Sequence, residues 1–254
     1  MIELNDIKAD QGDFLLQVDQ LRLRENDFVA ILGNNGSGKS TFLSILSGLK
    51  EYSGSYNIRQ KDFQSVDVVE RHRQIGLLPQ ATTLNMPFDV FYVVLTGRFP
   101  HTDGNRYAEV DVASTKRVIE KFDIAHLKNR QFNELSGGEK QRVLLARMIN
   151  RDAPIILLDE PLSGIDIKHQ FEILRFLKAL SRDRIILVAI HDISLAVREF
   201  DRFLFFEKGS LSYDVPKEAL KEDRLSDIFS VQVKFLKHDK GFFVYINEGS
   251  HETR

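Results

Sequence analysis

Two patterns of apolar residues occur along the chain. Residues 14–24, FLLQVDQLRLR, largely alternate between apolar and polar side chains, which is typical of half-buried antiparallel strands. Three other runs, DFVAIL, PIILLD and RIILVAIH, are short and continuously apolar, and helical stretches separate them. Such runs are typical of buried parallel strands. The pattern predicts an α/β fold with a mostly parallel sheet and an antiparallel β layer.

The middle of the chain has a different spacing. Residues 81–150 are mainly helical in pattern, as in VASTKRVIEKFDI, and Gly97, Pro100 and TDGN interrupt them. We expect a helical subdomain inserted into a core made of residues 1–80 and 151–230. Residues 231–254 place VQVKFL and GFFVYI around HDKG, which predicts a C-terminal hairpin and tail. The chain, residues 1–254, is expected to form a single domain.

Composition restricts the partners. The chain has 254 residues, a formal net charge of -2 and no cysteine. Balanced charge gives no general attraction to nucleic acid, so no nucleic-acid partner is expected. Disulfides and thiolate metal sites are impossible. The start, MIELNDIKAD, lacks a signal-peptide pattern, and no window has the ~20 apolar residues that a membrane helix needs. A role at a membrane would therefore require a partner.

The first buried run ends in a phosphate-binding motif. GNNGSGKS fits the P-loop pattern and opens the helical sequence KSTFLSILSG. Glycines are needed because backbone N–H groups must approach phosphate oxygens closely. Lys39 is expected to reach the β- and γ-phosphates, and Ser40 to coordinate Mg²⁺. The predicted cradle consists of Gly33, Asn34, Asn35, Gly36, Ser37, Gly38, Lys39, Ser40 and Thr41.

Acidic residues and a histidine follow the other two runs. Asp159 and Glu160 come at the end of PIILLDEP, and His191 ends RIILVAIH. Two such carboxylates alone are more often simply solvated. With a P-loop upstream, Asp159 is the expected partner of Mg²⁺ and Glu160 a candidate base for the attacking water. A lone histidine is usually structural, but His191 could sense the γ-phosphate. Because ligands bind beyond the carboxyl ends of parallel strands, we expect these groups to meet.

The segment LSGGEKQR, residues 135–142, opens another amphipathic stretch. Ser136 and Glu139 have the spacing of a capping box. Gly137 and Gly138 fall in the first turn, where each costs roughly 1 kcal/mol relative to alanine. A helix cap alone leaves both glycines unexplained, and it leaves open what this bare helix end contacts.

The order of the P-loop, Gln80, LSGGE, IILLDEP, LSGID and His191 resembles the ATP-binding cassette (ABC) family over most of residues 1 to about 230. The resemblance implies a P-loop NTPase core that hydrolyses ATP with Mg²⁺. Gln80 corresponds to the glutamine loop, with a role in catalysis and at the metal, Asp166 to the D-loop aspartate, and His191 to the switch histidine. It also implies a head-to-tail homodimer, in which the signature residues of one chain cover ATP on the other. These are Ser136, Gly137, Gly138 and Glu139.

Transport fits this resemblance better than the non-transport alternatives. The insert is too short for the coiled coils of DNA-repair cassettes, and ribosome-associated members usually have two cassettes. We expect a peripheral import subunit on the cytoplasmic face of the inner membrane, bound to an integral permease and served indirectly by a substrate-binding protein. Phe88, Val90, Val94 and Leu95 are candidates for a groove that binds a permease helix. Subdomain core is an equal alternative for each of them.

The run VVLTGRFPH is similar to cassettes that power import of iron chelates, haem and cobalamin, and zinc and manganese cassettes share part of it. His101 lacks a spaced second ligand, so we expect a solvent or partner contact rather than a metal site. The family's adenine-stacking position holds Asp10 or Gln11, and Phe14, the nearest aromatic residue, is more often core. Asn26 replaces a common turn glycine and tolerates positive φ.

Overall fold

The computed structural model describes residues 1–12, 14–80, 87–102, 104, 106–238 and 241–247. Parts of the predicted helical insert, residues 81–86, of the sequences TDGN and HDKG, and of the tail, residues 248–254, lie outside the described residues.

Ten described strands form one sheet in the order β5-β4-β1-β2-β10-β9-β3-β8-β7-β6. The parallel part comprises β9 (Arg202–Glu207), β3 (Phe28–Leu32), β8 (Ile185–Ala189), β7 (Ile155–Asp159) and β6 (Ile75–Leu78). The antiparallel part comprises β1 (Ile2–Gln11), β2 (Phe14–Leu23), β4 (Ser53–Ile58), β5 (Lys61–Asp62) and, against β9, β10 (Ser210–Pro216). This confirms the predicted fold class.

Helices cover both faces of the parallel strands, which is why these strands are continuously apolar. Val29 and Ile31 of β3 pack in one buried cluster with Phe42 of α1 (Lys39–Leu46). Ala30 and Leu32 belong to a second cluster, which includes residues of α5 (Gly137–Asn150), α6 (Ile167–Leu180) and α7 (Ile193–Glu199). Successive side chains of a strand point to opposite faces, so both faces are buried.

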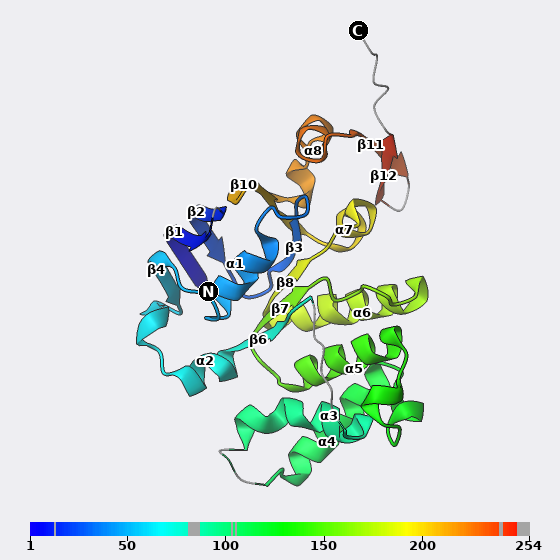
Figure 1. Ribbon diagram of the computed structural model, residues 1–254. Helices are drawn as coiled ribbons and strands as arrows, with labels where there is room; N and C mark the ends of the chain where they lie inside the picture. The colour runs from blue at the N-terminus through cyan, green and yellow to red at the C-terminus, as the bar shows by residue number, and fades with distance from the viewer. Residues whose placement is uncertain (13, 81–86, 103, 105, 239–240, 248–254) are drawn as a thin grey trace.

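The helices of the insert lie together on one side of the molecule (Figure 1). They are α3 (Val90–Leu95), α4 (Glu109–Lys121) and α5, and α2 (Val68–Gln74) precedes β6. Short 3₁₀ helices are η1 (Phe63–Ser65), η2 (Thr96–His101), η3 (Ala125–Leu127), η4 (Phe132–Glu134), η5 (Ser181–Asp183) and η6 (Lys217–Ala219). Arg98 of η2 and Asp111 of α4 form a buried ion pair of 2.9 Å between Nε and Oδ1.

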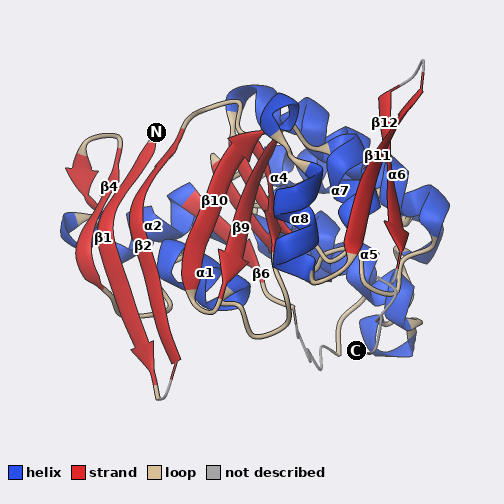
Figure 2. Ribbon diagram, turned by 90° about the horizontal axis from the view of Figure 1, so that it is seen from above, coloured by secondary structure: helices blue, strands red, loops and turns tan. Residues whose placement is uncertain are grey.

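The C-terminal part contains α8 (Glu222–Phe229) and a hairpin of β11 (Gln232–His238) and β12 (Gly241–Asn247). The hairpin forms a separate sheet, far from the antiparallel edge of the large one (Figure 2). It packs against α7 through β12 and against α8 through β11. Within the described ranges, none of the helices is long and apolar enough to cross a membrane.

Candidate functional site

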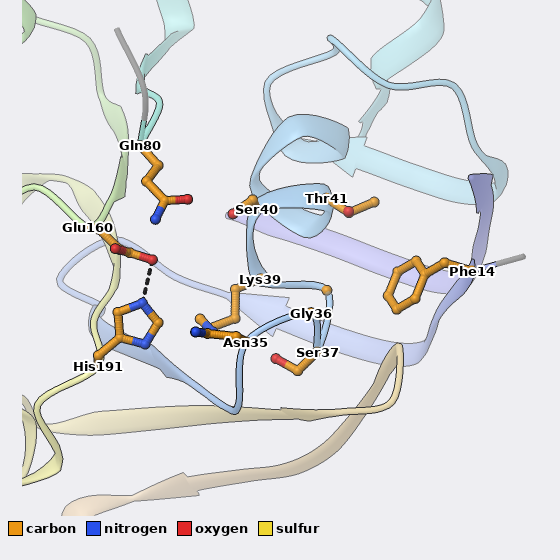
Figure 3. Close-up of a pocket in the computed structure, with 11 residues that line it drawn as sticks. Phe14, Asn35, Gly36, Ser37, Lys39, Ser40, Thr41, Gln80, Glu160 and His191 are labelled. Atoms are coloured by element: carbon orange, nitrogen blue, oxygen red, sulfur yellow. Dashed lines mark hydrogen bonds and ion pairs between the residues drawn. The ribbon is translucent and has the colours of Figure 1, made fainter. Parts of the chain in front are cut away.

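An open pocket of about 860 Å³ lies beyond the carboxyl ends of β3, β6, β7 and β8, where the sequence predicted it. Figure 3 shows its walls converging from the P-loop on one side and from Gln80, Glu160 and His191 on the other. The lining residues are Phe14, Asn35, Gly36, Ser37, Gly38, Lys39, Ser40, Thr41, Gln80, Glu160 and His191. Residues as far apart in the sequence as Phe14 and His191 thus form one site.

The P-loop is folded tightly enough to require glycine. Gly33 has φ of 148°, and a Cβ there would lie 2.3 Å from the Phe206 carbonyl oxygen. Gly38 has φ of 110° at the N-cap of α1. Both positions therefore depend on the absence of a side chain. The loop surrounds Lys39, and the N-terminus of α1 faces the pocket. A helix N-terminus that follows such a loop is an arrangement that binds phosphate.

Lys39 is buried behind the loop. Its Nζ donates to the carbonyl oxygens of Gly33, at 2.8 Å, and Asn34, at 3.1 Å. Burial lowers the pKa of the Lys39 ammonium, while the negative charges of Glu160 and Asp159 oppose that shift. The Ser37 hydroxyl is also buried, with no hydrogen-bond partner among the described residues. The pocket therefore presents a cation and an unused hydroxyl group, both suited to phosphate oxygens.

Asp159 ends β7, is buried outside the pocket lining, and accepts a hydrogen bond from Ser40, which lines the pocket. Burial raises the pKa of its carboxyl group, and a hydrogen bond from Ser40 and the charges of Lys39 and His191 oppose the rise, while Glu160 adds to it. Its Oδ1 is buried and has no partner in the described part of the chain. Buried polar atoms are rarely left unpartnered. A hard cation held by oxygen atoms would satisfy this carboxylate, and Ser40 stands beside it.

Glu160 and His191 contact each other on the wall of the pocket that faces the P-loop (Figure 3). His191 Nε2 and Glu160 Oε1 are hydrogen-bonded (Figure 3). Glu160 has a left-handed backbone with φ of 49°, and its N–H donates to the Ala189 carbonyl at 3.0 Å. Such a conformation is unfavourable for a side chain of this kind and is found most often at functional sites. It turns the carboxylate toward the pocket.

The other predicted residues lie outside this pocket. At the start of α5, Ser136 and Glu139 form the predicted capping box: Glu139 accepts from Ser136 N–H at 2.8 Å and from Ser136 Oγ at 2.7 Å. These hydrogen bonds lower the pKa of Glu139. Asp166 caps α6 and is exposed. The structure therefore does not bring Ser136, Glu139 or Asp166 to the nucleotide pocket of their own chain.

The two signature glycines have different explanations. A Cβ on Gly138 would lie 2.6 Å from the carbonyl oxygen of Gly164, so contact within the chain requires this glycine. A Cβ on Gly137 would meet no described atom within 4 Å. The expectation that a cap leaves both glycines without an internal cause was therefore wrong for Gly138. The presence of a glycine at position 137 therefore has no cause among the described contacts of the chain and could be explained by contact with another molecule.

Three of the four residues predicted to line a permease groove do not lie on the surface. Val90, Val94 and Leu95 are buried core, so they cannot line a docking surface, whereas Phe88 is 45% exposed. A pocket of about 430 Å³ does lie beside it, and its outer wall holds the exposed Tyr92 and Phe99. The apolar residues of α3 have helical spacing, but the sequence alone could not show which face of the helix points into the core. The lining residues are Leu77, Leu78, Pro79, Phe88, Tyr92, Thr96, Gly97, Phe99, Pro100, Tyr107, Leu144, Arg147, Met148 and Arg151.

Residues of the LTGRFPH segment make contacts within the chain. A Cβ on Gly97 would lie 2.1 Å from the Arg147 carbonyl oxygen. Arg98 is buried against Asp111. His101 Nε2 lies 2.7 Å from the Arg151 carbonyl oxygen, and the His101 side chain is exposed, so the expected solvent contact is accompanied by an internal one. These residues hold η2 to α4 and α5.

Two further sequence predictions concern Phe14, at the edge of the pocket, and Asn26, in the turn before β3. Phe14 is half-buried on the core and also lines the pocket, a position that sequence reasoning ranked second to a purely structural one. From sequence, the position of Phe14 at the pocket could have been inferred only from the family resemblance, which places the first hairpin near the P-loop. Asn26 has φ of 78°, as predicted for its turn.

Comparison with known proteins gives consistent similarities. Residues 16–163 match the ABC transporter family. The hemin import ATP-binding protein HmuV of Pseudomonas entomophila is 34% identical over 247 residues, which cover 94% of this chain and 96% of the relative. The cobalamin import ATP-binding protein BtuD of Halobacterium salinarum is 34% identical over 87% of this chain. That match covers 56% of the relative, so the chain spans little more than half of its length.

Two solved structures are similar to the whole fold. A chain of a metal-chelate type ABC transporter, in an inward-facing conformation, has a TM-score of 0.81 and 25% identity, and the match covers 97% of this chain and 96% of that chain. A dimeric ATP-binding cassette in a post-hydrolysis state, bound to ADP and Pi, has a TM-score of 0.75 and 27% identity. That match covers 87% of this chain and 100% of the other.

Proposed function

The chain belongs to the ABC transporter family, and from that membership we propose that it is the ATP-hydrolysing subunit of an importer, which energises uptake of an iron complex or cobalamin through a separate membrane permease. One observation is the main support for ATP hydrolysis. Lys39 in a P-loop and the Glu160–His191 pair, far apart in sequence, face each other across one pocket.

ATP binds at the P-loop in this proposal. The Lys39 ammonium, which donates to the carbonyl oxygens of Gly33 and Asn34, also donates to the γ-phosphate. The N-terminus of α1 and the free Ser37 hydroxyl bind further phosphate oxygens. Phe14 lines the opposite end of the pocket from Glu160 (Figure 3), and in this proposal its ring contacts the adenine ring.

Ser40, Asp159 and Gln80 would hold Mg²⁺. The fit rests on the unpartnered Oδ1 of Asp159, on the Ser40 hydroxyl beside it, and on the Gln80 side chain in the same pocket. These are oxygen donors of the kind that Mg²⁺ prefers, and phosphate oxygens would complete the set. When bound, the ion neutralises charge on the β- and γ-phosphates.

Glu160 orients or deprotonates the attacking water, and His191 holds Glu160 and faces the γ-phosphate. The support is geometric: the carboxylate hydrogen-bonds with the imidazole, and the backbone of Glu160 fixes its direction. A carboxylate held in this way accepts a proton from water in line with the phosphate that is transferred. Glu160→Gln is expected to retain ATP affinity and to lose most turnover, and unchanged hydrolysis by this variant would contradict the assignment.

Two copies of the chain complete the site. Ser136, Gly137, Gly138, Glu139 and Asp166 are absent from the pocket wall of their own chain, although they belong to motifs that bind nucleotide in this family. A head-to-tail homodimer places them over the ATP of the second copy. Gly137, which has open space around its Cα, then allows the helix N-terminus to approach the γ-phosphate.

The permease is proposed to bind at the groove beside Phe88. Phe88, Tyr92 and Phe99 are exposed by 45%, 41% and 64%, and the rings of Phe88 and Tyr92 are 4.9 Å apart. Adjacent exposed aromatic side chains beside a pocket are typical of a surface that binds a helix of another protein. The subunit is then peripheral, on the cytoplasmic face of the cell membrane, and a substrate-binding protein delivers cargo to the opposite side.

The cargo class rests on the relatives, named for hemin and cobalamin import, because the LTGRFPH segment is used inside the chain. The test is reconstitution of the copurifying permease and this chain in vesicles, with ATP supplied on the side of this subunit. Labelled ferric siderophore, haem, cobalamin, zinc or manganese is offered on the other side. Uptake of zinc or manganese alone would refute the chelate assignment and leave the ATPase mechanism in place.

A further inference from the structure

A polar cluster at the start of α6 joins three segments outside the nucleotide pocket. His169 Nδ1 lies 2.6 Å from Oδ2 of Asp166, and the backbone N–H of His169 donates to Oδ1 of Asp166 at 3.2 Å. On the other side of the ring, Nε2 lies 3.1 Å from Nη1 of Arg142 and 3.4 Å from Oδ2 of Asp123. The imidazole of His169 is thus placed between the end of α4, the helix α5 and the loop that precedes α6.

The contacts of His169 with Asp166 and Arg142 fit one tautomer of the ring. With the proton on Nδ1, His169 donates to Asp166, and the lone pair on Nε2 accepts from the guanidinium of Arg142. The hydrogen bonds from His169 lower the pKa of the Asp166 carboxyl group, which therefore stays ionised. The His169 side chain is only 18% exposed. A half-buried imidazole with a partner on each nitrogen fixes the direction of Asp166, which is itself exposed.

The same loop, residues 160–166, is attached to α5 at two further points. The carbonyl oxygen of Gly164 approaches Gly138 so closely that a Cβ would lie 2.6 Å from it. Gln141 Nε2 donates to the Pro161 carbonyl oxygen at 3.1 Å. From α6, Gln170 Nε2 donates to the carbonyl oxygen of Ile165 at 2.9 Å. The loop is therefore clamped between the signature helix α5 and the first turn of α6.

We propose that His169 is a positioning residue that couples the loop 160–166 to α5, so that Asp166 and Ser136 are presented to the second copy as one rigid surface. This inference rests on the proposed homodimer. The loop begins at Glu160, which contacts His191 in the pocket. His169 therefore connects the hydrolytic carboxylate of one site with the signature that covers the nucleotide of the other.

An ordinary helix cap makes a different prediction. Asp166 caps α6 through Oδ1 and the backbone N–H of His169, a contact that does not need the imidazole. If capping were the only role, removal of the ring would leave association of the two copies unchanged. If the ring positions Asp166 against Arg142 on α5, its removal weakens ATP-driven association while nucleotide binding to the single chain is preserved.

The test compares variants in a Glu160→Gln background, which is expected to hold the ATP dimer. His169→Ala removes the ring, His169→Asn keeps a donor near the Nδ1 position, and Lys168→Ala is a matched control at a neighbouring side chain that is 77% exposed. Sedimentation equilibrium gives the dissociation constant of the ATP dimer. Fluorescent ADP binding and thermal unfolding of the monomer report on the pocket and on the fold.

His169→Ala is expected to weaken the ATP dimer about tenfold relative to Lys168→Ala, since hydrogen bonds to charged groups are involved. ADP affinity should stay within about twofold, and His169→Asn should recover most of the loss. A dimer constant of His169→Ala equal to that of Lys168→Ala would overturn the inference, as would a parallel loss of ADP affinity. If Glu160→Gln alone does not dimerise with ATP, the proposed homodimer itself fails.

Discussion

The buried pair of Arg98 and Asp111 should be a main link within the helical insert, between η2 and α4. Arg98 Nε donates to Asp111 Oδ1 at 2.9 Å, and their side chains are 10% and 5% exposed. Asp111 Oδ2 also accepts the N–H of Ala108 at 2.9 Å, and Arg98 Nη1 donates to the Asn150 carbonyl at 3.2 Å. Arg98→Ala leaves a buried carboxylate with one backbone donor. Loss of one partner of such a pair costs about 3–5 kcal/mol.

The assay is urea unfolding followed by circular dichroism. Arg98→Ala and Asp111→Ala should each lose about 3–5 kcal/mol of unfolding free energy, and the double variant less than their sum by about 0.5–3 kcal/mol. Arg117→Ala, an exposed arginine on α4, is the matched control and should change stability by less than about 0.5 kcal/mol. If Arg98→Ala costs no more than Arg117→Ala, the pair does not stabilise the packing of η2 on α4 within the insert.

The same pair predicts how the stability of the chain changes with pH. Burial by itself raises the pKa of the Asp111 carboxyl group, but hydrogen bonds from Arg98 and from the Ala108 N–H outweigh it, so the folded pKa is lower than the unfolded one. The advantage of the wild-type chain over Asp111→Asn should therefore be complete above the unfolded value of about 3.9 and disappear as the pH falls through the lower folded value. An advantage that grows toward acid would refute this reasoning.

Further predictions concern the pocket and the signature. Gly138→Ala should lower both melting temperature and ATPase activity because its Cβ meets the Gly164 carbonyl. Gly137→Ala should weaken ATP-dependent dimerisation, and with it ATPase activity, without lowering the melting temperature; indistinguishable melting temperatures of the two variants would contradict this. Phe14→Ala should weaken ATP binding severalfold in calorimetry, with Leu15→Ala as control; an unchanged dissociation constant would make Phe14 purely structural.

The pocket could be predicted because its determinants are local. The P-loop glycines, Lys39, Glu160 and His191 each follow a recognisable apolar run, and parallel strands must end at the same edge of a sheet. Sequence also predicted the capping box of Ser136 with Glu139, since both partners lie within one turn. Reasoning from adjacent residues is sufficient where the contact partners are close in the chain or are positioned by the sheet.

Other features depend on contacts that no local pattern contains. Gly138 is required by the carbonyl of Gly164, which follows β7, while Gly138 precedes it. The apolar residues of α3 could face the core or a groove, and only the packed helices show that Val90 is inside and Phe88 outside. The contacts of His169 with Arg142 join residues from separate helices. Such pairings follow from tertiary packing.

The most direct test of the composite ATP site mixes two inactive chains. Ser136→Arg blocks the signature and Lys39→Ala the P-loop, so each variant alone should be nearly inactive. In the mixed dimer, one site keeps an intact P-loop from the first chain and an intact signature from the second, and ATP hydrolysis should partly return. No recovery in a mixture that is proven to contain the heterodimer would contradict the composite site and leave Ser136 as a helix cap within its own chain.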